Sequence, residues 1–171
     1  MEILDSGERR EFESGAVRDI QEGKGRCDLL PLAEVAEILK ILDADFEPLD
    51  YIAMLIKPPH SLKSDKELAY RAIVSFCKDN KWDIVTALLE VAKHFEDGCK
   101  KYGERNWEKG IPAHCYIDSA VRHYLKWERG DTDEPHDRAF VWNMLCFAWT
   151  IENRPECRDL PGDTHGNGGQ T

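Results

Sequence analysis

The sequence has no long apolar run, no C-x-x-C motif and no apolar leader at its N-terminus. Its longest apolar run, residues 51–56, is far shorter than the ~20 residues of a membrane-spanning helix and ends at Lys57-Pro58-Pro59. The first five residues, M-E-I-L-D, are unlike a secretory signal. The six cysteines are scattered, which disfavours a zinc ribbon or a disulfide scaffold. We therefore expect a cytoplasmic protein with reduced thiols and no membrane partner.

Basic residues are also fewer than acidic residues. The 171 residues include 33 acidic and 23 basic side chains, which gives a net charge of −10. A field of this sign repels the phosphates of a polynucleotide, so we expect no polynucleotide partner. An acidic excess inside a cleft would instead attract divalent cations.

Glycine is absent between Gly25 and Gly98, and no segment shows a sustained alternation of apolar and polar residues. Glycine-free stretches with apolar residues three and four apart indicate helices, and the missing alternation argues against strands. The predicted fold class is therefore all-α, a helical bundle. The spacing predicts helices over about 31–42, 64–78, 83–102, 113–128 and 134–152, with a short apolar segment at 49–56.

The positions of the glycines and of the predicted helices divide the chain into three parts. Residues 1–30 are predicted to form a basic, glycine-bearing loop, and residues 31–152 the helical bundle that carries the catalytic site. Residues 153–171 are polar and rich in glycine, which is typical of a flexible tail.

One carboxylate occupies an apolar position in the helix predicted at 83–102. Glu96 lies seven residues after Leu89 and four after Ala92, along the stripe that these residues form. An ionised acid in apolar surroundings costs several kcal/mol, so Glu96 requires a partner. His94 falls outside the stripe and is expected on a solvated face.

The last predicted helix repeats this pattern. Asp137 lies one turn before the apolar Val141, and Glu134 lies seven residues before it. In the preceding helix, Asp118 borders the apolar arc. Carboxylates that meet on neighbouring helices suit hard cations such as Mg²⁺ or Mn²⁺, several of which can clamp a polyphosphate and activate a water. The alternative is that acids near a helix start, Glu134 among them, serve only as caps and partners of the helix dipole.

Two segments supply the complementary positive charge. The first, residues 14–26, has glycines that allow close backbone approach to a ligand, but its spacing is not the P-loop G-x-x-x-x-G-K-[ST]. In the second, residues 98–110, Tyr102 and Trp107 offer flat surfaces for a base and Asn106 a donor and an acceptor for its edge. The alternative is an ordinary basic turn that Trp107 anchors to the core. The cations predicted to hold phosphate are Lys24, Arg26, Lys100 and Lys101 of these segments, together with Arg122 of the helix predicted at 113–128.

These segments resemble the phage dATP/dGTP diphosphohydrolase family. The resemblance covers roughly residues 12–31 and 92–150, and the run G-x-K-K-Y-G-x-x-N-W at 98–107 is quite specific. Residues 43–82 match no pattern of the family and are expected to be an insertion. The other blocks that carry the resemblance are F-E-S-G-A-V-R-D at 12–19, G-K-G-R-C-D-L-L-P at 23–31, D-S-A-V-R-H at 118–123, and D-E-P-H at 133–136 with Asn143.

The family is related to the MazG-like all-α nucleoside triphosphate pyrophosphatases. The resemblance implies cleavage of a purine dNTP, dGTP or dATP or both, into dNMP and pyrophosphate with two or more Mg²⁺ or Mn²⁺ ions. It also implies homo-oligomers, dimers or tetramers, in which neighbouring chains complete the core of the bundle. The phage members known as MazZ act in pathways that replace adenine by 2-aminoadenine in viral DNA.

MazG-like enzymes hold metal with an E-E-x-x-E helix and an E-x-x-D helix. Glu134-x-x-Asp137 matches the second motif, whereas the first is absent and Glu96 and Asp118 are its nearest substitutes. Glu96, Glu134 and Asp137 are the predicted catalytic acids. The predicted metal ligands are Glu96, Asp118, Asp133, Glu134 and Asp137. The predicted substrate-binding residues are Arg18, Lys24, Arg26, Lys100, Lys101, Tyr102, Asn106, Trp107, Lys109, Arg122, His123, His136 and Asn143, with His136 also open as a metal ligand or a neighbour of one.

Two other functions stay open on the sequence. His136-Asp137 reads as the H-D pair of an HD-domain phosphohydrolase, with His94, His114 and His123 as the histidines left to complete its metal site. The other alternative is a non-catalytic helical module that binds nucleotides.

Overall fold

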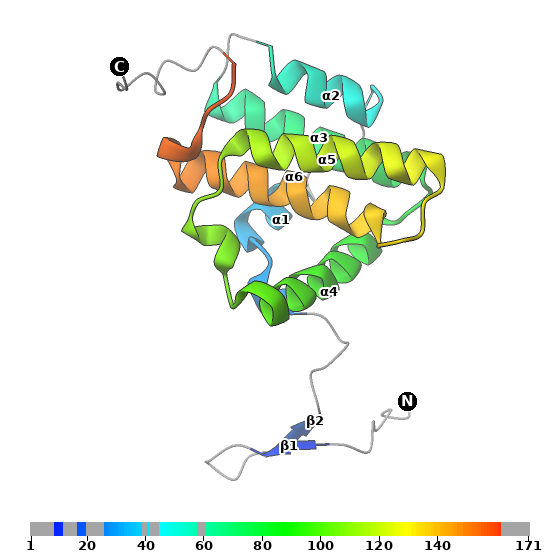
Figure 1. Ribbon diagram of the computed structural model, residues 1–171. Coiled ribbons are helices and arrows are strands. Elements are labelled where there is room, and N and C mark those ends of the chain that lie inside the picture. The colour runs from blue at the N-terminus through cyan, green and yellow to red at the C-terminus, as the bar shows by residue number, and fades with distance from the viewer. Residues whose placement is uncertain are drawn as a thin grey trace.

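The computed structural model describes residues 9–11, 17–19, 26–38, 41, 45–57 and 61–161, and these residues are mostly helical (Figure 1). This confirms the predicted all-α fold class. The α-helices are α1 (Leu32–Ile38), α2 (Pro48–Leu55), α3 (Leu62–Asp79), α4 (Ile84–Tyr102), α5 (Ala113–Arg129) and α6 (His136–Asn153). The short 3-10 helices are η1 (Cys27–Leu29), η2 (Asn106–Lys109) and η3 (Pro155–Cys157).

A small hairpin departs from the prediction that the chain has no strands. The strands β1 (Arg9–Glu11) and β2 (Val17–Asp19) pair antiparallel, with Arg9 opposite Asp19. Each strand has three residues, which is too short for an alternating pattern to stand out in the sequence.

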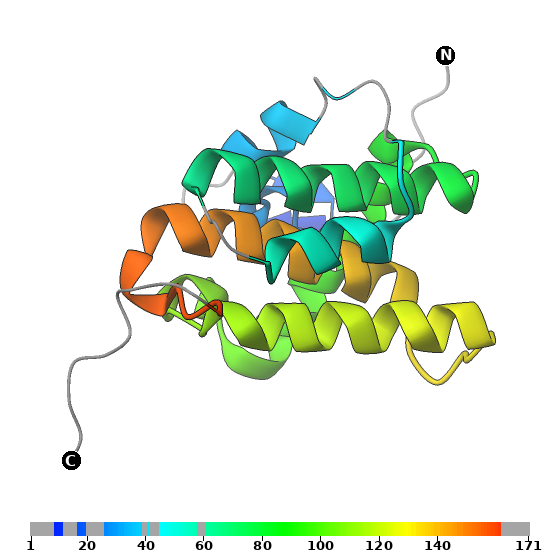
Figure 2. The same ribbon diagram turned by 90° about the horizontal axis from the view of Figure 1, so that it is seen from above.

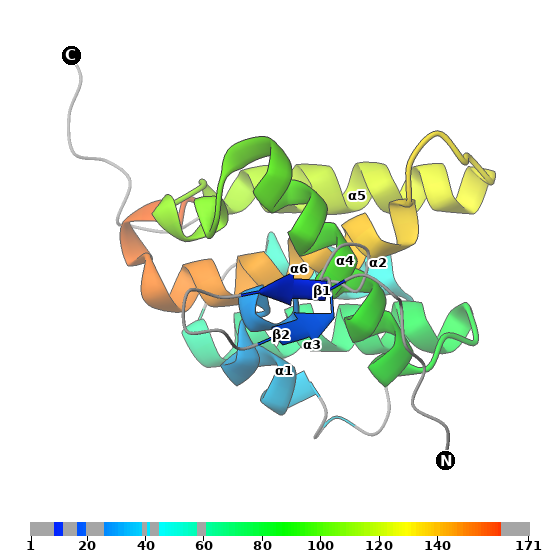
Figure 3. The same cartoon turned by 90° about the horizontal axis from the view of Figure 1, so that it is seen from below.

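Helix α6 forms the centre of the bundle because its sequence is apolar on almost every side. Seen from above, α3, α6 and α5 lie side by side with nearly parallel axes, and α6 runs in the direction opposite to the other two (Figure 2). Seen from below, α4 runs obliquely across α6 (Figure 3), and α2 packs on α3. The buried apolar residues of α6 are Ala139, Phe140, Val141, Met144, Leu145, Cys146, Phe147, Ala148 and Ile151.

Three helix starts differ from or refine the predicted bounds. The N-terminus of α3 is capped by Ser61, whose hydroxyl accepts a hydrogen bond from the N–H of Ser64, so the helix begins before the predicted capping box. The predicted apolar segment 49–56 is the helix α2. Helix α6 begins at His136 rather than 134, because Pro135 occupies its N-cap position. Asp133 and Glu134 therefore lie in the loop before the helix.

The start of the predicted flexible tail is packed against the bundle. Leu160 is buried, and Arg158 forms an ion pair of 2.5 Å with the buried Asp65 of α3. Burial of one apolar side chain and one buried charge pair therefore order residues 154–161, whereas 162–171 lie outside the described residues. None of the helices in the described ranges is long and apolar enough to cross a bilayer.

Candidate functional site

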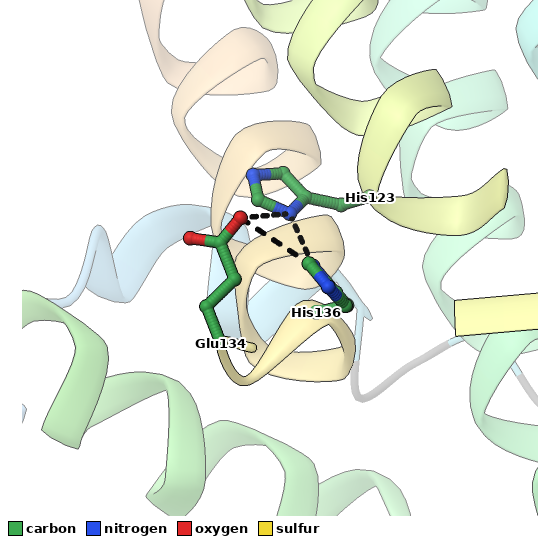
Figure 4. A group of neighbouring side chains, drawn as sticks. All are labelled: His123, Glu134 and His136. Carbon is green, nitrogen blue, oxygen red and sulfur yellow. Dashed lines mark hydrogen bonds and ion pairs between the residues drawn. The ribbon is translucent and has the colours of Figure 1, made fainter. Parts of the chain in front are cut away.

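Three side chains from two elements and the loop between them meet at the start of α6 (Figure 4). His123 projects from α5, His136 is the first residue of α6, and Glu134 lies in the loop before it. The two Nδ1 atoms of the histidines are 3.0 Å apart. Oε1 of Glu134 lies 3.7 Å from Nδ1 of His123 and 3.6 Å from Nδ1 of His136. We call these three residues the histidine cluster.

Asp133 fixes the orientation of the His136 ring. Its Oδ1 lies 2.8 Å from Nε2 of His136, and its Oδ2 accepts a hydrogen bond of 2.8 Å from Lys126. These hydrogen bonds, from Lys126 first and His136 second, hold the pKa of Asp133 well below its usual range. The tautomer of His136 that donates its Nε2–H to this carboxylate has its lone pair on Nδ1, the atom that faces His123.

The histidine cluster is half closed to solvent. His136 is 1% exposed and His123 is 7% exposed, whereas the side chain of Glu134 is 44% exposed. Burial lowers the pKa of His123 to about 4, although the charge of Glu134 acts in the opposite direction. His123 is therefore neutral at pH 7, the protonation state in which imidazole binds metal ions.

The donor atoms of this region can hold a metal ion. The two histidine nitrogens and the Glu134 oxygen lie within 4.8 Å of one another. A second group with the same spacing joins His136 to Asp131 and Asp133. Two of the predicted metal ligands, Asp133 and Glu134, thus belong to such groups.

A pocket of about 420 Å³ lies between α4, η2 and α6. It is lined by Tyr102, Asn106 and Trp107, the residues that the sequence predicts to contact base or sugar. Gly98 and Arg105 of the same run also line it. The run at 98–107 therefore surrounds a cavity of the size that small ligands occupy.

Trp107 forms an inner wall of this pocket and is not an exposed platform for stacking. It is buried, and its ring packs edge-on against Trp149, with centroids 4.7 Å apart, and against Phe95 at 5.6 Å. Its indole N–H has no hydrogen-bond partner among the described residues. Trp107 therefore does both things that the sequence left open: it anchors the turn to the core, and it lines the pocket.

His94 is half-buried, which the predicted solvated face did not include. It lines the pocket, and its ring centroid is 5.7 Å from that of Trp142 of α6. Burial lowers its pKa, while the charges of Glu134 and Asp137 raise it. The spacing held a signal for this position, because His94, Gly98 and Tyr102 follow one another at four-residue intervals and share one face of α4.

Glu96 is buried as its position in the stripe predicts, but the structure does not bring it into either metal-binding group. Its Oε1 lies 3.2 Å from the ammonium of Lys100, one turn later.

Two acids predicted to bind metal lie apart from the histidine cluster. Asp118 is exposed on α5 and lines a surface groove with Arg122 and Lys126, and Arg122 donates a hydrogen bond to Ser119. Asp137 is half-buried, and its carboxylate accepts a hydrogen bond of 2.7 Å from the N–H of Arg138. Neither carboxylate is part of a metal-binding group among the described residues.

The other predicted binding residues are dispersed. Arg26 pairs with Asp28 at 2.7 Å and with Glu104 at 2.9 Å. Asn143 is buried and donates a hydrogen bond to the carbonyl of Ala139. Lys101 lies with its ammonium 4.9 Å from the ring centroid of Tyr102, and Lys109 is exposed at the end of η2. The side chain of Arg18 and the whole of Lys24 lie outside the described residues.

Comparison with known proteins gives one family. A family model described as the N-terminal domain of dATP/dGTP diphosphohydrolase matches residues 61–160, which include α3 to α6, the histidine cluster and all the residues that line the pocket except Leu29. The match begins inside the segment 43–82 and includes α3, which packs on α6. Searches of the curated proteins and of the solved structures give no match.

Proposed function

The chain belongs to the dATP/dGTP diphosphohydrolase family, and we propose that it cleaves a purine dNTP, dGTP or dATP or both, between the α and β phosphates. The products are then dNMP and pyrophosphate. The observation that carries this proposal is that α6 contributes to both parts of the site, since its Trp142 lines the pocket and its His136 belongs to the histidine cluster. The pocket suits a nucleoside, and the histidine cluster suits a divalent cation.

The pocket would bind the nucleoside through its apolar walls. Phe95, Cys99 and Trp142 exclude water from the base, and the Asn106 amide offers a donor and an acceptor for the edge of the base. The unpartnered N–H of Trp107 is a further donor available at this wall. Lys100 and Lys101, which follow on α4, are the cations proposed to hold the phosphates.

The histidine cluster would act at the scissile phosphate. A divalent cation bound there neutralises phosphate charge and lowers the pKa of a bound water. Glu134 is the exposed carboxylate of the cluster, so we assign it the orientation of the attacking water. Lys126, 3.8 Å from Oε1 of Glu134, is placed to stabilise the leaving pyrophosphate.

Product analysis tests the proposed bond cleavage. The purified protein is incubated with dGTP or dATP and with Mg²⁺ or Mn²⁺, and the products are separated by ion-exchange chromatography. We expect dNMP and pyrophosphate in equal amounts. Release of dNDP and inorganic phosphate would contradict the proposal, and nucleotide binding without turnover over hours would favour the non-catalytic module.

Replacement of one carboxylate tests the assignment of the site. We expect Glu134→Gln to lower kcat by about 10²–10⁴-fold, because it removes the carboxylate that orients water. The helical circular dichroism should stay unchanged, because this side chain is exposed. Glu128→Gln, the same change on an exposed residue of α5, is the matched control and should keep full activity. Equal kinetics of the two variants would remove Glu134 from the site.

A second candidate function is favoured by one observation. His136-Asp137 is accompanied by His123 of a separate helix, whose Nδ1 lies 3.0 Å from Nδ1 of His136, and an HD-type phosphohydrolase needs further ligands from separate helices. Such an enzyme would release tripolyphosphate from dGTP. The same product analysis therefore distinguishes the two reactions.

Three finer points extend the proposal from the family resemblance. We expect a homo-oligomer, a dimer or a tetramer, which light scattering of the purified protein measures. The exposed apolar side chains of Val85, Leu89 and Leu125 are the surface that such an assembly would cover. We also expect cytoplasmic action in phage nucleotide metabolism linked to 2-aminoadenine DNA.

A further inference from the structure

We propose that the histidine cluster is a three-ligand site for a transition-metal ion, of the kind exemplified by Mn²⁺, Co²⁺ and Zn²⁺, and that it discriminates against Mg²⁺. The ligands are Nδ1 of His123, Nδ1 of His136 and Oε1 of Glu134. This inference rests on the proposed function for the use of the ion in catalysis, and it goes further by assigning two nitrogen ligands and the class of metal.

The distances between the three atoms fit a single ion. They are 3.0, 3.6 and 3.7 Å, and the point equidistant from the three atoms lies about 2.0 Å from each of them. Bonds from a transition metal to imidazole nitrogen or carboxylate oxygen are about 2.0–2.2 Å long. An ion at that point needs no movement of the backbone.

The Nδ1 atoms of the two rings face one another. Asp133 accepts a hydrogen bond from Nε2–H of His136, and this tautomer has its lone pair on Nδ1, the atom that faces His123. Two ring nitrogens 3.0 Å apart share either one proton or one cation. A carboxylate that accepts a hydrogen bond from the outer nitrogen of a histidine is the usual support of a metal-binding imidazole, and Asp133 supplies it.

The donor set determines which ion is preferred. Mg²⁺ takes oxygen ligands and retains most of its waters, whereas imidazole nitrogen suits the transition metals. Two of the three donors here are imidazole nitrogens, and both rings are at least nine-tenths buried. The third, Glu134, borders solvent. An ion held in this way has its remaining coordination positions open toward water or a substrate phosphate.

Cobalt binding tests the ligands without measuring turnover. Co²⁺ is titrated into the metal-free protein, and its visible absorption bands report coordination by nitrogen. We expect one equivalent to bind, and we expect His123→Ala and His136→Ala each to weaken binding by at least 100-fold. Asp133→Ala, which removes the support of His136, should weaken it by about 10–100-fold. His114→Ala, which alters an exposed histidine outside the cluster, is the matched control and should bind as the wild type does.

Two further readouts keep the proposal testable where a histidine variant does not fold. Pulsed electron paramagnetic resonance of the Mn²⁺-loaded wild type should show coupling to ¹⁴N of imidazole, and a thousandfold excess of Mg²⁺ should not displace the ion. Coupling to water protons alone, or displacement by Mg²⁺ at equal concentration, would overturn the proposal. A protein that coordinates Mn²⁺ through nitrogen but does not hydrolyse dNTPs would instead contradict the proposed function.

Discussion

At the residue scale, Glu34 of α1 is a buried acid outside the candidate site. It is 1% exposed, and neither of its carboxylate oxygens has a hydrogen-bond partner among the described residues. The nearest cation is Lys66, whose ammonium lies 3.5 Å from Oε1 and also pairs with Glu152. Burial raises the pKa of Glu34 above its ordinary value, more than Lys66 lowers it. The folded protein therefore binds a proton at this side chain more tightly than the unfolded chain does.

The raised pKa of Glu34 gives stability a defined dependence on pH. Its contribution is complete below the unfolded-state pKa near 4.5 and is lost as the pH rises through the higher folded-state pKa. We expect Glu34→Gln to match the wild type near pH 4 and to gain about 1–3 kcal/mol over it at pH 7–8. Thermal unfolding at both ends of this range measures the difference. Glu128→Gln on the exposed face of α5 is the control, and a gain that does not change with pH would refute the assignment.

The sequence identifies His123 and His136 as candidate site residues, but it does not show that the two side chains meet. The spacing identifies Glu134 and the D-E-P-H block, but it predicts Glu134 inside a helix. In the structure Glu134 lies in the loop before α6. The meeting of His123 with His136 depends on how α5 and α6 pack, and a turn from 130 to 135 sets this register. Short-range periodicity carries no information on such a contact between helices.

At the element scale, the helices that carry the site follow from local sequence. Helices α4, α5 and α6 begin and end within two residues of their predicted bounds, because apolar stripes and terminating glycines are local signals. Gly103, with φ 87°, ends α4, and Gly130, with φ 82°, ends α5. The face of α4 that lines the pocket was less evident, because Val85 and Leu89, which belong to its apolar stripe, are exposed.

Two glycines on either side of η2 should respond oppositely to alanine. A Cβ on Gly98 of α4 would meet no atom within 4 Å, so Gly98→Ala should stabilise the helix by about 0.5–1 kcal/mol. Its methyl group would enter the pocket, and we expect KM for dGTP to rise about tenfold. Thermal unfolding and steady-state kinetics measure the two effects; an unchanged KM would exclude this face of α4 from the substrate site.

Gly110 is the counterpart whose substitution should destabilise. It has φ 103°, and a Cβ there would lie 2.9 Å from Sγ of Cys157. We expect Gly110→Ala to lower the free energy of unfolding by about 1–3 kcal/mol, because the backbone would be strained and η3 displaced. Denaturant unfolding measures this loss. Equal stability of the two alanine variants would show that η2 and η3 do not pack as described.

At the scale of the whole molecule, the histidine cluster joins α5 to the start of the central helix. His123 comes from one side of the turn between these helices, and Glu134 and His136 come from the other. Unfolding separates these ligands, so an ion that binds all three binds only the native state. The chain also has a net charge of −10, and any divalent cation will relieve part of its self-repulsion. The stabilisation by an ion bound to the histidine cluster must therefore be separated from the relief of charge repulsion that any divalent cation provides.

A comparison of two cations separates them. At one hundred times its dissociation constant, Mn²⁺ should stabilise the native state by about 2.7 kcal/mol, which raises Tm by roughly 5–10 °C for a chain of this size. Mg²⁺ at the same concentration supplies the same ionic strength and charge without a preference for imidazole, so its shift should be small. His123→Ala should reduce the Mn²⁺ shift to that of Mg²⁺, whereas His114→Ala should retain it. Equal shifts with both cations in the wild type would mean that the acidic surface, and not the histidine cluster, binds the metal.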